Sequence, residues 1–79
     1  MTVNLYAVRD VKSTYMSPVV GSNDAQAMRA FRAGMRSVPE FEVSPADFEL
    51  YRIGEYNNES GLISPTIPPV WICSGSEEV

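Results

Sequence analysis

The sequence contains no histidine and a single cysteine, and these two features exclude much of the usual catalytic chemistry. Histidine is the common general base near neutral pH, and structural zinc sites need several Cys or His ligands. Cys73 has no partner for an intramolecular disulfide and no histidine to activate its thiol, so we interpret it as a buried or incidental cysteine. We therefore expect no metal, no cofactor and no catalytic residue, and a protein that is not an enzyme.

Other signals are also missing. The five glycines stand alone, so there is no glycine-rich phosphate loop, and the scattered carboxylates show no spacing typical of an acid and base pair. No apolar run approaches membrane-spanning length, and the N-terminus lacks the pattern of a signal peptide. Six Lys and Arg against ten Asp and Glu give a net charge of −4, which argues against coating nucleic acid by bulk electrostatics. The net charge does not exclude a local basic patch. We expect a cytosolic protein without membrane association.

The clearest element is the segment from Ser22 to Val38, which has helical periodicity. Polar residues at positions 22 to 24 can cap its first turn, and Pro39 disfavours helix at the residue before it. Its apolar residues fall on one side of the predicted helix: Ala27, Met28, Phe31, Met35 and Val38. This side must be buried, in the core of a monomer or at a subunit interface.

Strand patterns flank this helix. Residues Val3 to Arg9 predict a strand, Asp10 to Thr14 a turn, and Tyr15 to Val20 a second strand that Pro18 places at an edge. Residues Glu40 to Pro45 have no clear period, and we expect a loop there.

The second half of the chain adds a long strand from Asp47 to Tyr56. Its phase switches near Leu50 and Tyr51, which indicates either a bulge or a strand covered on both faces. Residues 57–61 predict a turn. Beyond it, prolines separate the segments 62–66 and 70–73, which predict one or two short strands, and residues 74–79 are expected to form a flexible tail.

These elements predict a single α+β domain over residues 1–79. One helix packs on a small antiparallel sheet, and the order along the chain is β-β-α-β-β. A domain of 79 residues buries only about 60% of its unfolded surface. Its stability is therefore modest, and we expect a homo-oligomer.

A stripe of arginines is the most suggestive polar feature. Arg29, Arg32 and Arg36 share a helix face roughly 120° from the apolar side, and paired guanidinium donors suit phosphate. Further candidates for contact with single-stranded nucleic acid are the basic residues Arg9, Lys12 and Arg52 and the strand aromatics Tyr6 and Tyr51. The alternative explanations are a solvated helix face for the arginines and core packing for the aromatics.

Two segments resemble a known family. They are LYAVRDVKSTYMSPVVGSNDAQAMRAFRAGM and PADFELYRIGEYNNESG, which are similar to the small nonstructural protein of gokushovirus-type microviruses, phages with single-stranded DNA genomes. That family has an A-x-R-x-F helix, here Ala27 to Phe31, and an aromatic strand of the type D-[FY]-x-L-[FY]-x-[IL]-G. The positions that match the strand and the turn after it are Asp47, Phe48, Leu50, Tyr51, Ile53, Gly54 and Gly61.

The family is usually described as nonstructural or DNA-binding, so the resemblance implies a role in the infected cell. We expect a bacteriophage accessory protein that assists single-stranded DNA replication or packaging in the host cell cytoplasm. Its expected partners are single-stranded DNA and viral or host replication or packaging proteins. The alternative is a small homo-oligomeric interaction module that binds a host or viral protein, through an exposed strand edge and without DNA contact.

Overall fold

The computed structural model describes residues 1–39 and 44–76. Along these residues the elements are β1 (Thr2–Asp10), β2 (Val19–Gly21), α1 (Asp24–Ser37), a 3₁₀ turn η1 (Pro45–Asp47), β3 (Phe48–Asn57) and β4 (Ile63–Ser74). The strands form one antiparallel sheet in the order β2-β1-β3-β4. The fold is therefore α+β, and its order along the chain is β-β-α-β-β, as the sequence predicts.

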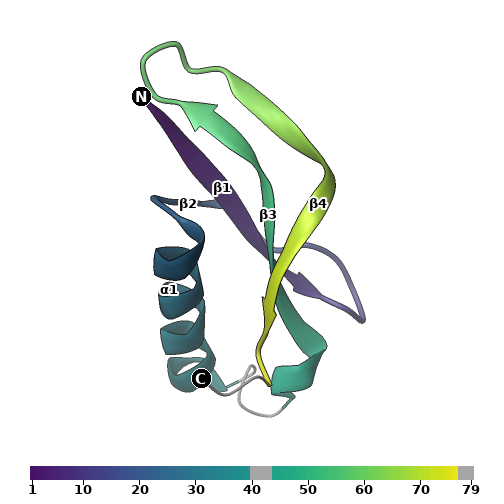
Figure 1. Cartoon of the computed structure of the whole chain (residues 1–79). Helices are drawn as coiled ribbons and strands as arrows, with labels where there is room; N and C mark the ends of the chain where they lie inside the picture. The colour runs from purple at the N-terminus through teal and green to yellow at the C-terminus, as the bar shows by residue number, and fades with distance from the viewer. Residues whose placement is uncertain (40–43, 77–79) are drawn as a thin grey trace.

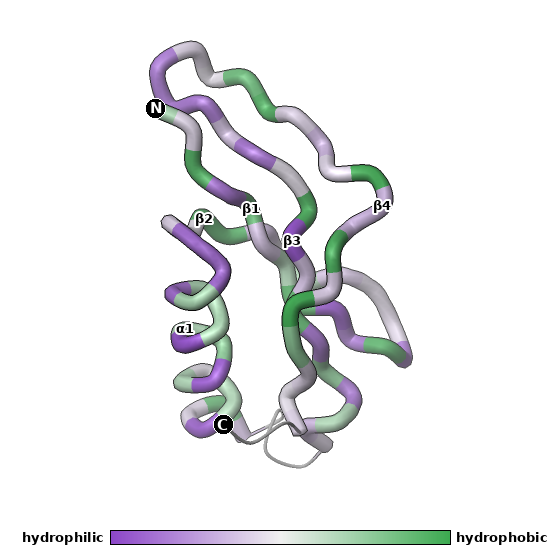
Figure 2. The backbone as a smooth tube through the Cα atoms, viewed as in Figure 1, coloured by the Kyte–Doolittle hydropathy of each residue, from purple (hydrophilic) through white to green (hydrophobic). Residues whose placement is uncertain are grey.

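Helix α1 covers one face of the sheet over only part of its length. The end of the sheet that carries the N-terminus and the β3–β4 turn extends beyond the helix (Figure 1). Apolar residues nevertheless recur along β4 up to this turn (Figure 2). Leu62, Ile63 and Ile67 are the most exposed of them, at 70%, 65% and 84%. The molecule is elongated as a result, with extents of 40 × 22 × 18 Å.

The ends of α1 are set by the groups that satisfy its terminal backbone atoms. The side chain of Asn23 accepts a hydrogen bond of 2.8 Å from the N–H of Gln26, which caps the first turn. At the other end the N–H of Val38 donates to the carbonyl of Gly34. The helix lies within the predicted range and is shorter by two residues at its start and by one at its end.

The core lies between α1 and the sheet. Ala27, Phe31 and Met35 are buried on the helix, and Met28 and Val38 are half-buried against the core, which confirms the predicted apolar side. The sheet contributes four buried side chains, and these are Tyr6, Phe48, Leu50 and Cys73. Cys73 has no exposed surface, so its interpretation as a buried cysteine is confirmed.

The first hairpin is less regular than the sequence predicts. The turn at Asp10 to Thr14 is confirmed by bonds of 2.9 and 3.0 Å between the backbone groups of Asp10, Ser13 and Thr14. The second strand is shorter than the predicted range of 15–20, because Tyr15 forms only an isolated bridge to Arg9 before β2 begins. Pro18 lacks an N–H and interrupts the ladder there. As predicted, β2 is an edge strand.

Bulges accompany the phase switch in β3. Leu50 pairs with Cys73 while the next residue, Tyr51, pairs with Trp71, so Ile72 of β4 is the extra residue. A second shift lies opposite Leu5 and Tyr6, where Ile53 is the extra residue. A bulge therefore lies where the phase switches, but its extra residue belongs to β4, so Leu50 and Tyr51 still point to opposite faces of the sheet. Tyr51 contacts Tyr15 on the face that α1 does not cover, so the switch also reflects side-chain contacts on both faces of β3.

The prediction for the last segment needs correction. The two short stretches 62–66 and 70–73 are parts of one twelve-residue strand, β4. The prolines between them are tolerated because β4 is an edge strand, where a missing N–H costs no ladder bond on the outer side. The turn before it is confirmed, since Gly61 has a φ of 77° and donates to the carbonyl of Asn57.

Two further predictions fall partly outside the described residues. Ser74 ends β4 and the N–H of Gly75 donates to the carbonyl of Phe48 at 2.8 Å, so these residues do not belong to a tail. Residues 77–79 lie outside the described residues. Residues 40–43, the larger part of the loop predicted over residues 40–45, also lie outside the described residues. The 3₁₀ turn η1 begins at Pro45, the last residue of the predicted loop.

Candidate nucleic-acid interface

A polar network fixes the start of α1 to the sheet. The hydroxyl of Tyr6 on β1 donates to Asp24 Oδ1 at 2.6 Å, and Arg52 Nη1 on β3 donates to Asp24 Oδ2 at 2.7 Å. Asn4 Nδ2 donates to the Tyr6 hydroxyl at 3.0 Å. Asp24 stands in the first turn of the helix, where a negative charge also interacts favourably with the helix dipole.

The network shifts the titration of its members. The hydrogen bond from Tyr6, together with the ion pair to Arg52, holds the pKa of Asp24 below its ordinary value of 3.8, although partial burial opposes this shift. Burial and the nearby Asp24 carboxylate raise the pKa of Tyr6. Asp24 therefore stays ionised, and the Tyr6 hydroxyl stays protonated, across the neutral range.

Two predicted interface residues belong to this network. Tyr6 has no exposed surface, so the prediction that its ring stacks on bases is wrong. Its ring fills the core and its hydroxyl satisfies Asp24. Arg52 is bound to Asp24 as well, which gives this weaker candidate a structural role at the start of the helix.

The three helix arginines line one shallow groove. Its volume is about 280 Å³, and Ala25 and Met28 complete the lining together with Arg29, Arg32 and Arg36. Arg29 and Arg36 are exposed, and neither forms an ion pair within the described residues. The helix rises about 1.5 Å per residue, so these two are about 10 Å apart along the axis. The structure thus brings the predicted stripe together on one surface.

The remaining predicted cations lie elsewhere. Arg9 is opposite Glu49 in the β1–β3 register, on the sheet face that α1 does not cover. Its guanidinium lies 5.8 Å from the centre of the Tyr15 ring. Lys12, in the turn after β1, forms an ion pair of 3.4 Å with Asp47. The structure therefore does not place Arg9 and Lys12 beside the groove on α1.

Tyr51 lies on the same uncovered face as Arg9. Its ring makes an edge-to-face contact with Tyr15, with ring centres 5.6 Å apart, and it is paired across the strands with Trp71. The choice of Tyr6 and Tyr51 as the stacking residues left out Tyr15 and Trp71, which are 43% and 46% exposed. Regular alternation would place Trp71 on the same side as the buried Cys73, and only the bulge at Ile72, for which the sequence has no local signal, turns its ring to the outer face.

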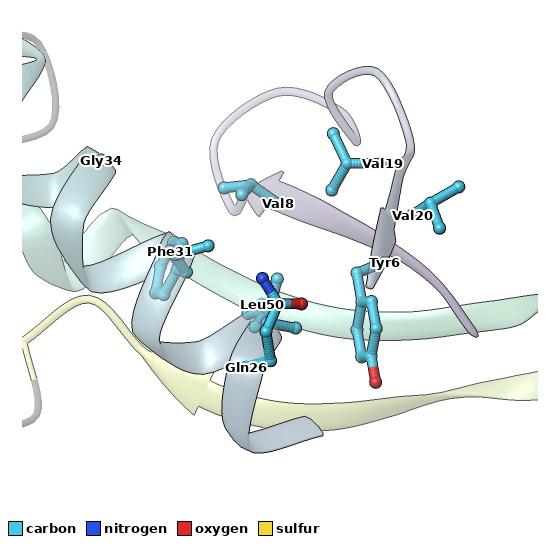
Figure 3. Close-up of a pocket in the computed structure, with 10 residues that line it drawn as sticks. Tyr6, Val8, Val19, Val20, Gln26, Phe31, Gly34 and Leu50 are labelled. Carbon is cyan, nitrogen blue, oxygen red and sulfur yellow. The ribbon is translucent and has the colours of Figure 1, made fainter. Parts of the chain in front are cut away.

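A separate cavity of about 330 Å³ lies on the helix side of the sheet, between α1 and the β1–β2 pair (Figure 3). Its walls are mainly apolar and include Val8, Val19, Phe31 and Leu50, with Gln26 at the helix. Lys, Arg, Asp and Glu do not occur among its lining residues. The sequence does not predict this cavity, because it predicts a second strand over residues 15–20 that is longer than β2.

Two other kinds of feature are absent from the described residues. In residues 1–39 and 44–76 there is no helix long and apolar enough to cross a membrane. In the same ranges no three His, Cys, Asp or Glu side chains come together as a metal site would require.

The described chain is thus a small α+β protein with half of its six basic residues in one groove of its helix. Residues 3–78 match the family described as Phage ORF5 protein, and the chain belongs to this family. It is therefore a small bacteriophage protein, as the resemblance implies at this coarser level. No curated protein and no solved structure matches the chain.

Proposed function

We propose that the protein is a nonstructural accessory protein of a gokushovirus-type microvirus that binds single-stranded DNA through the groove on α1. It assists genome replication or packaging in the host cell cytoplasm, together with viral or host replication or packaging proteins, and it has no enzymatic activity of its own. The observation that carries the proposal is the alignment of Arg29, Arg32 and Arg36 in one groove.

The chemistry of the groove favours phosphate. The exposed guanidinium groups of Arg29 and Arg36 offer planar paired donors, and the half-buried Met28 in the same lining provides apolar surface beside them. Arg36 stands in the last turn of the helix, where a cation is stabilised by the helix dipole. Because the whole chain has a net charge of −4, contact with DNA phosphates is restricted to this strip, and only two or three phosphates are engaged.

Fluorescence anisotropy with labelled single-stranded oligonucleotides tests the proposal. The wild type is expected to bind saturably at low salt and more weakly at physiological salt. An Arg29→Ala/Arg36→Ala variant is expected to lose most of this binding. Both side chains are exposed, so the variant is expected to keep the wild-type circular dichroism spectrum.

A matched control separates the groove from net charge. Asn58→Asp/Ser60→Asp also lowers the formal net charge by two, from −4 to −6, but at the exposed β3–β4 turn. This control is expected to bind like the wild type. If it loses binding as strongly as the arginine variant, the groove is not the contact surface. Absence of wild-type binding at low salt would show that the isolated protein does not bind single-stranded DNA.

The exposed apolar residues of β4 favour a second candidate function, a homo-oligomeric module that binds a protein partner. Ile63 and Ile67 are exposed on the edge strand β4, and the end of this strand at the β3–β4 turn extends beyond α1 (Figure 1). Pro65, Pro68 and Pro69 weaken backbone pairing along this stretch, so the contact would be made by side chains. Sedimentation velocity tests this candidate. The wild type is expected to sediment as an oligomer, and the Ile63→Ser/Ile67→Ser variant as a monomer. A monomeric wild type would exclude the homo-oligomer.

A further inference from the structure

We propose that the sheet face opposite α1 holds a stacking site for a base of single-stranded nucleic acid, formed by Tyr15, Tyr51 and Trp71 with Arg9 beside them. This inference rests on the proposed function and deepens it. The helix groove takes phosphates, and the sheet face takes the bases.

The three rings come from separate segments and meet on one face. Tyr51 and Trp71 are direct cross-strand partners on β3 and β4, so their side chains project to the same side of the sheet. Tyr15 reaches this side through its bridge to Arg9, and its ring stands at 77° to that of Tyr51. The neighbours Leu50 and Cys73 point to the opposite side, into the core beneath α1.

The rings are accessible despite their size. Trp71 is 46% exposed and Tyr15 is 43% exposed. The core of this small domain has few large side chains, and these two rings are not used to fill it. An edge-to-face contact between Tyr15 and Tyr51 leaves ring faces free for a further aromatic group. The Tyr51 hydroxyl donates to Glu49 Oε1 at 3.3 Å, which holds this ring in place. The site is therefore arranged before a ligand arrives.

The charges on this face favour a base rather than a phosphate chain. Arg9 lies over the Tyr15 ring and forms no ion pair within the described residues, so its planar guanidinium can also contact a base face. Glu49, opposite Arg9 in the register, balances its charge. A face with aromatic rings and almost no net charge binds by stacking, which depends little on the sequence of the strand and weakly on salt.

Trp71 is the only tryptophan of the chain, so its fluorescence reports directly on this face. Titration with oligo-dT is expected to quench Trp71 emission along the same curve as the anisotropy change. An abasic oligonucleotide of equal length has the same phosphates without bases. It is expected to bind roughly tenfold more weakly and to leave the emission unchanged.

Variants test the site independently. Tyr15→Leu is expected to weaken oligo-dT binding roughly tenfold with an unchanged salt dependence, whereas Tyr15→Phe keeps the ring and binds like the wild type. Ile67→Ala removes an exposed apolar side chain of β4 outside the site and is the control. The abasic comparison uses the wild type, so it remains informative if Tyr15→Leu does not fold.

The failure of this inference can be distinguished from failure of the proposed function. If oligo-dT and the abasic strand bind equally and Trp71 emission does not change, the stacking site is rejected while DNA binding by the groove stands. If neither strand changes the anisotropy at low salt, both proposals are rejected.

Discussion

At the scale of single residues, Asp24 joins three parts of the chain that are distant in sequence. It receives hydrogen bonds from Tyr6 and Arg52, over separations of 18 and 28 residues, and it belongs to the first turn of α1. A hydrogen bond to a charged group contributes more than one between neutral groups. The network therefore determines where the helix starts on the sheet, and with it the position of the arginine groove.

Removal of one hydroxyl tests this role. Tyr6→Phe keeps the buried ring but leaves Asp24 Oδ1 without its 2.6 Å donor, so we expect a loss of about 1 to 2 kcal/mol in the free energy of unfolding. Tyr15→Phe is the control, because the Tyr15 hydroxyl has no hydrogen bond within the described residues. It should change the free energy by less than about 0.5 kcal/mol. Urea denaturation measures both, and equal effects would contradict the role of the network.

The same network predicts a pH dependence. The folded pKa of Asp24 lies below its ordinary value of 3.8, so its contribution to stability is complete above about pH 5 and is lost as the pH falls through the folded pKa. We expect the wild type to lose more stability than Asp24→Asn between about pH 5 and pH 2. Urea midpoints across this range measure the difference, and parallel curves would show that Asp24 makes no such contribution.

At the scale of whole elements, the helix could be predicted from the sequence, whereas the facing of the strand residues could not. The position of α1 follows from local signals, namely the apolar period, the capping Asn23 and the terminal proline, and the same period places Arg29, Arg32 and Arg36 together. The side toward which a strand residue points depends on register and bulges. These arise from pairing between distant segments, which explains why Trp71 was missed.

Other errors have similar causes. A tyrosine on a strand is equally compatible with stacking and with core packing, and it is the register of β1 that places Tyr6 on the core face beneath α1. The prolines of β4 suggest an interruption in the sequence. In the structure they cost little because the strand lies at the edge of the sheet.

Two glycines in different elements give opposite predictions. A Cβ at Gly54 of β3 would lie 2.6 Å from the backbone oxygen of Ser64, so Gly54→Ala is expected to destabilise the β3–β4 hairpin by roughly 2 kcal/mol. A Cβ at Gly34 of α1 meets no atom within 4 Å. Gly34→Ala should therefore stabilise the protein by about 0.5 to 1 kcal/mol through helix propensity. Urea denaturation of the two variants measures both signs, and destabilisation by Gly34→Ala would contradict the description of α1.

At the scale of the molecule, the two DNA contacts that we propose for this acidic protein lie on separate surfaces. Three of its six basic residues line the groove on α1, and three aromatic rings lie on the face of the sheet that the helix leaves uncovered. This separation makes the two contributions measurable one at a time, since phosphate contacts depend on salt and stacking does so only weakly.

The salt dependence of oligo-dT binding is the most direct test of the central claim that α1 contacts phosphates. Each phosphate contact with a single strand contributes about −0.7 to the slope of log K against log salt concentration. The slope of Arg29→Ala/Arg36→Ala should therefore be shallower than that of the wild type by about 1.4, while Asn58→Asp/Ser60→Asp keeps the wild-type slope. Equal slopes for the wild type and the arginine variant would contradict the assignment of the groove as a DNA contact.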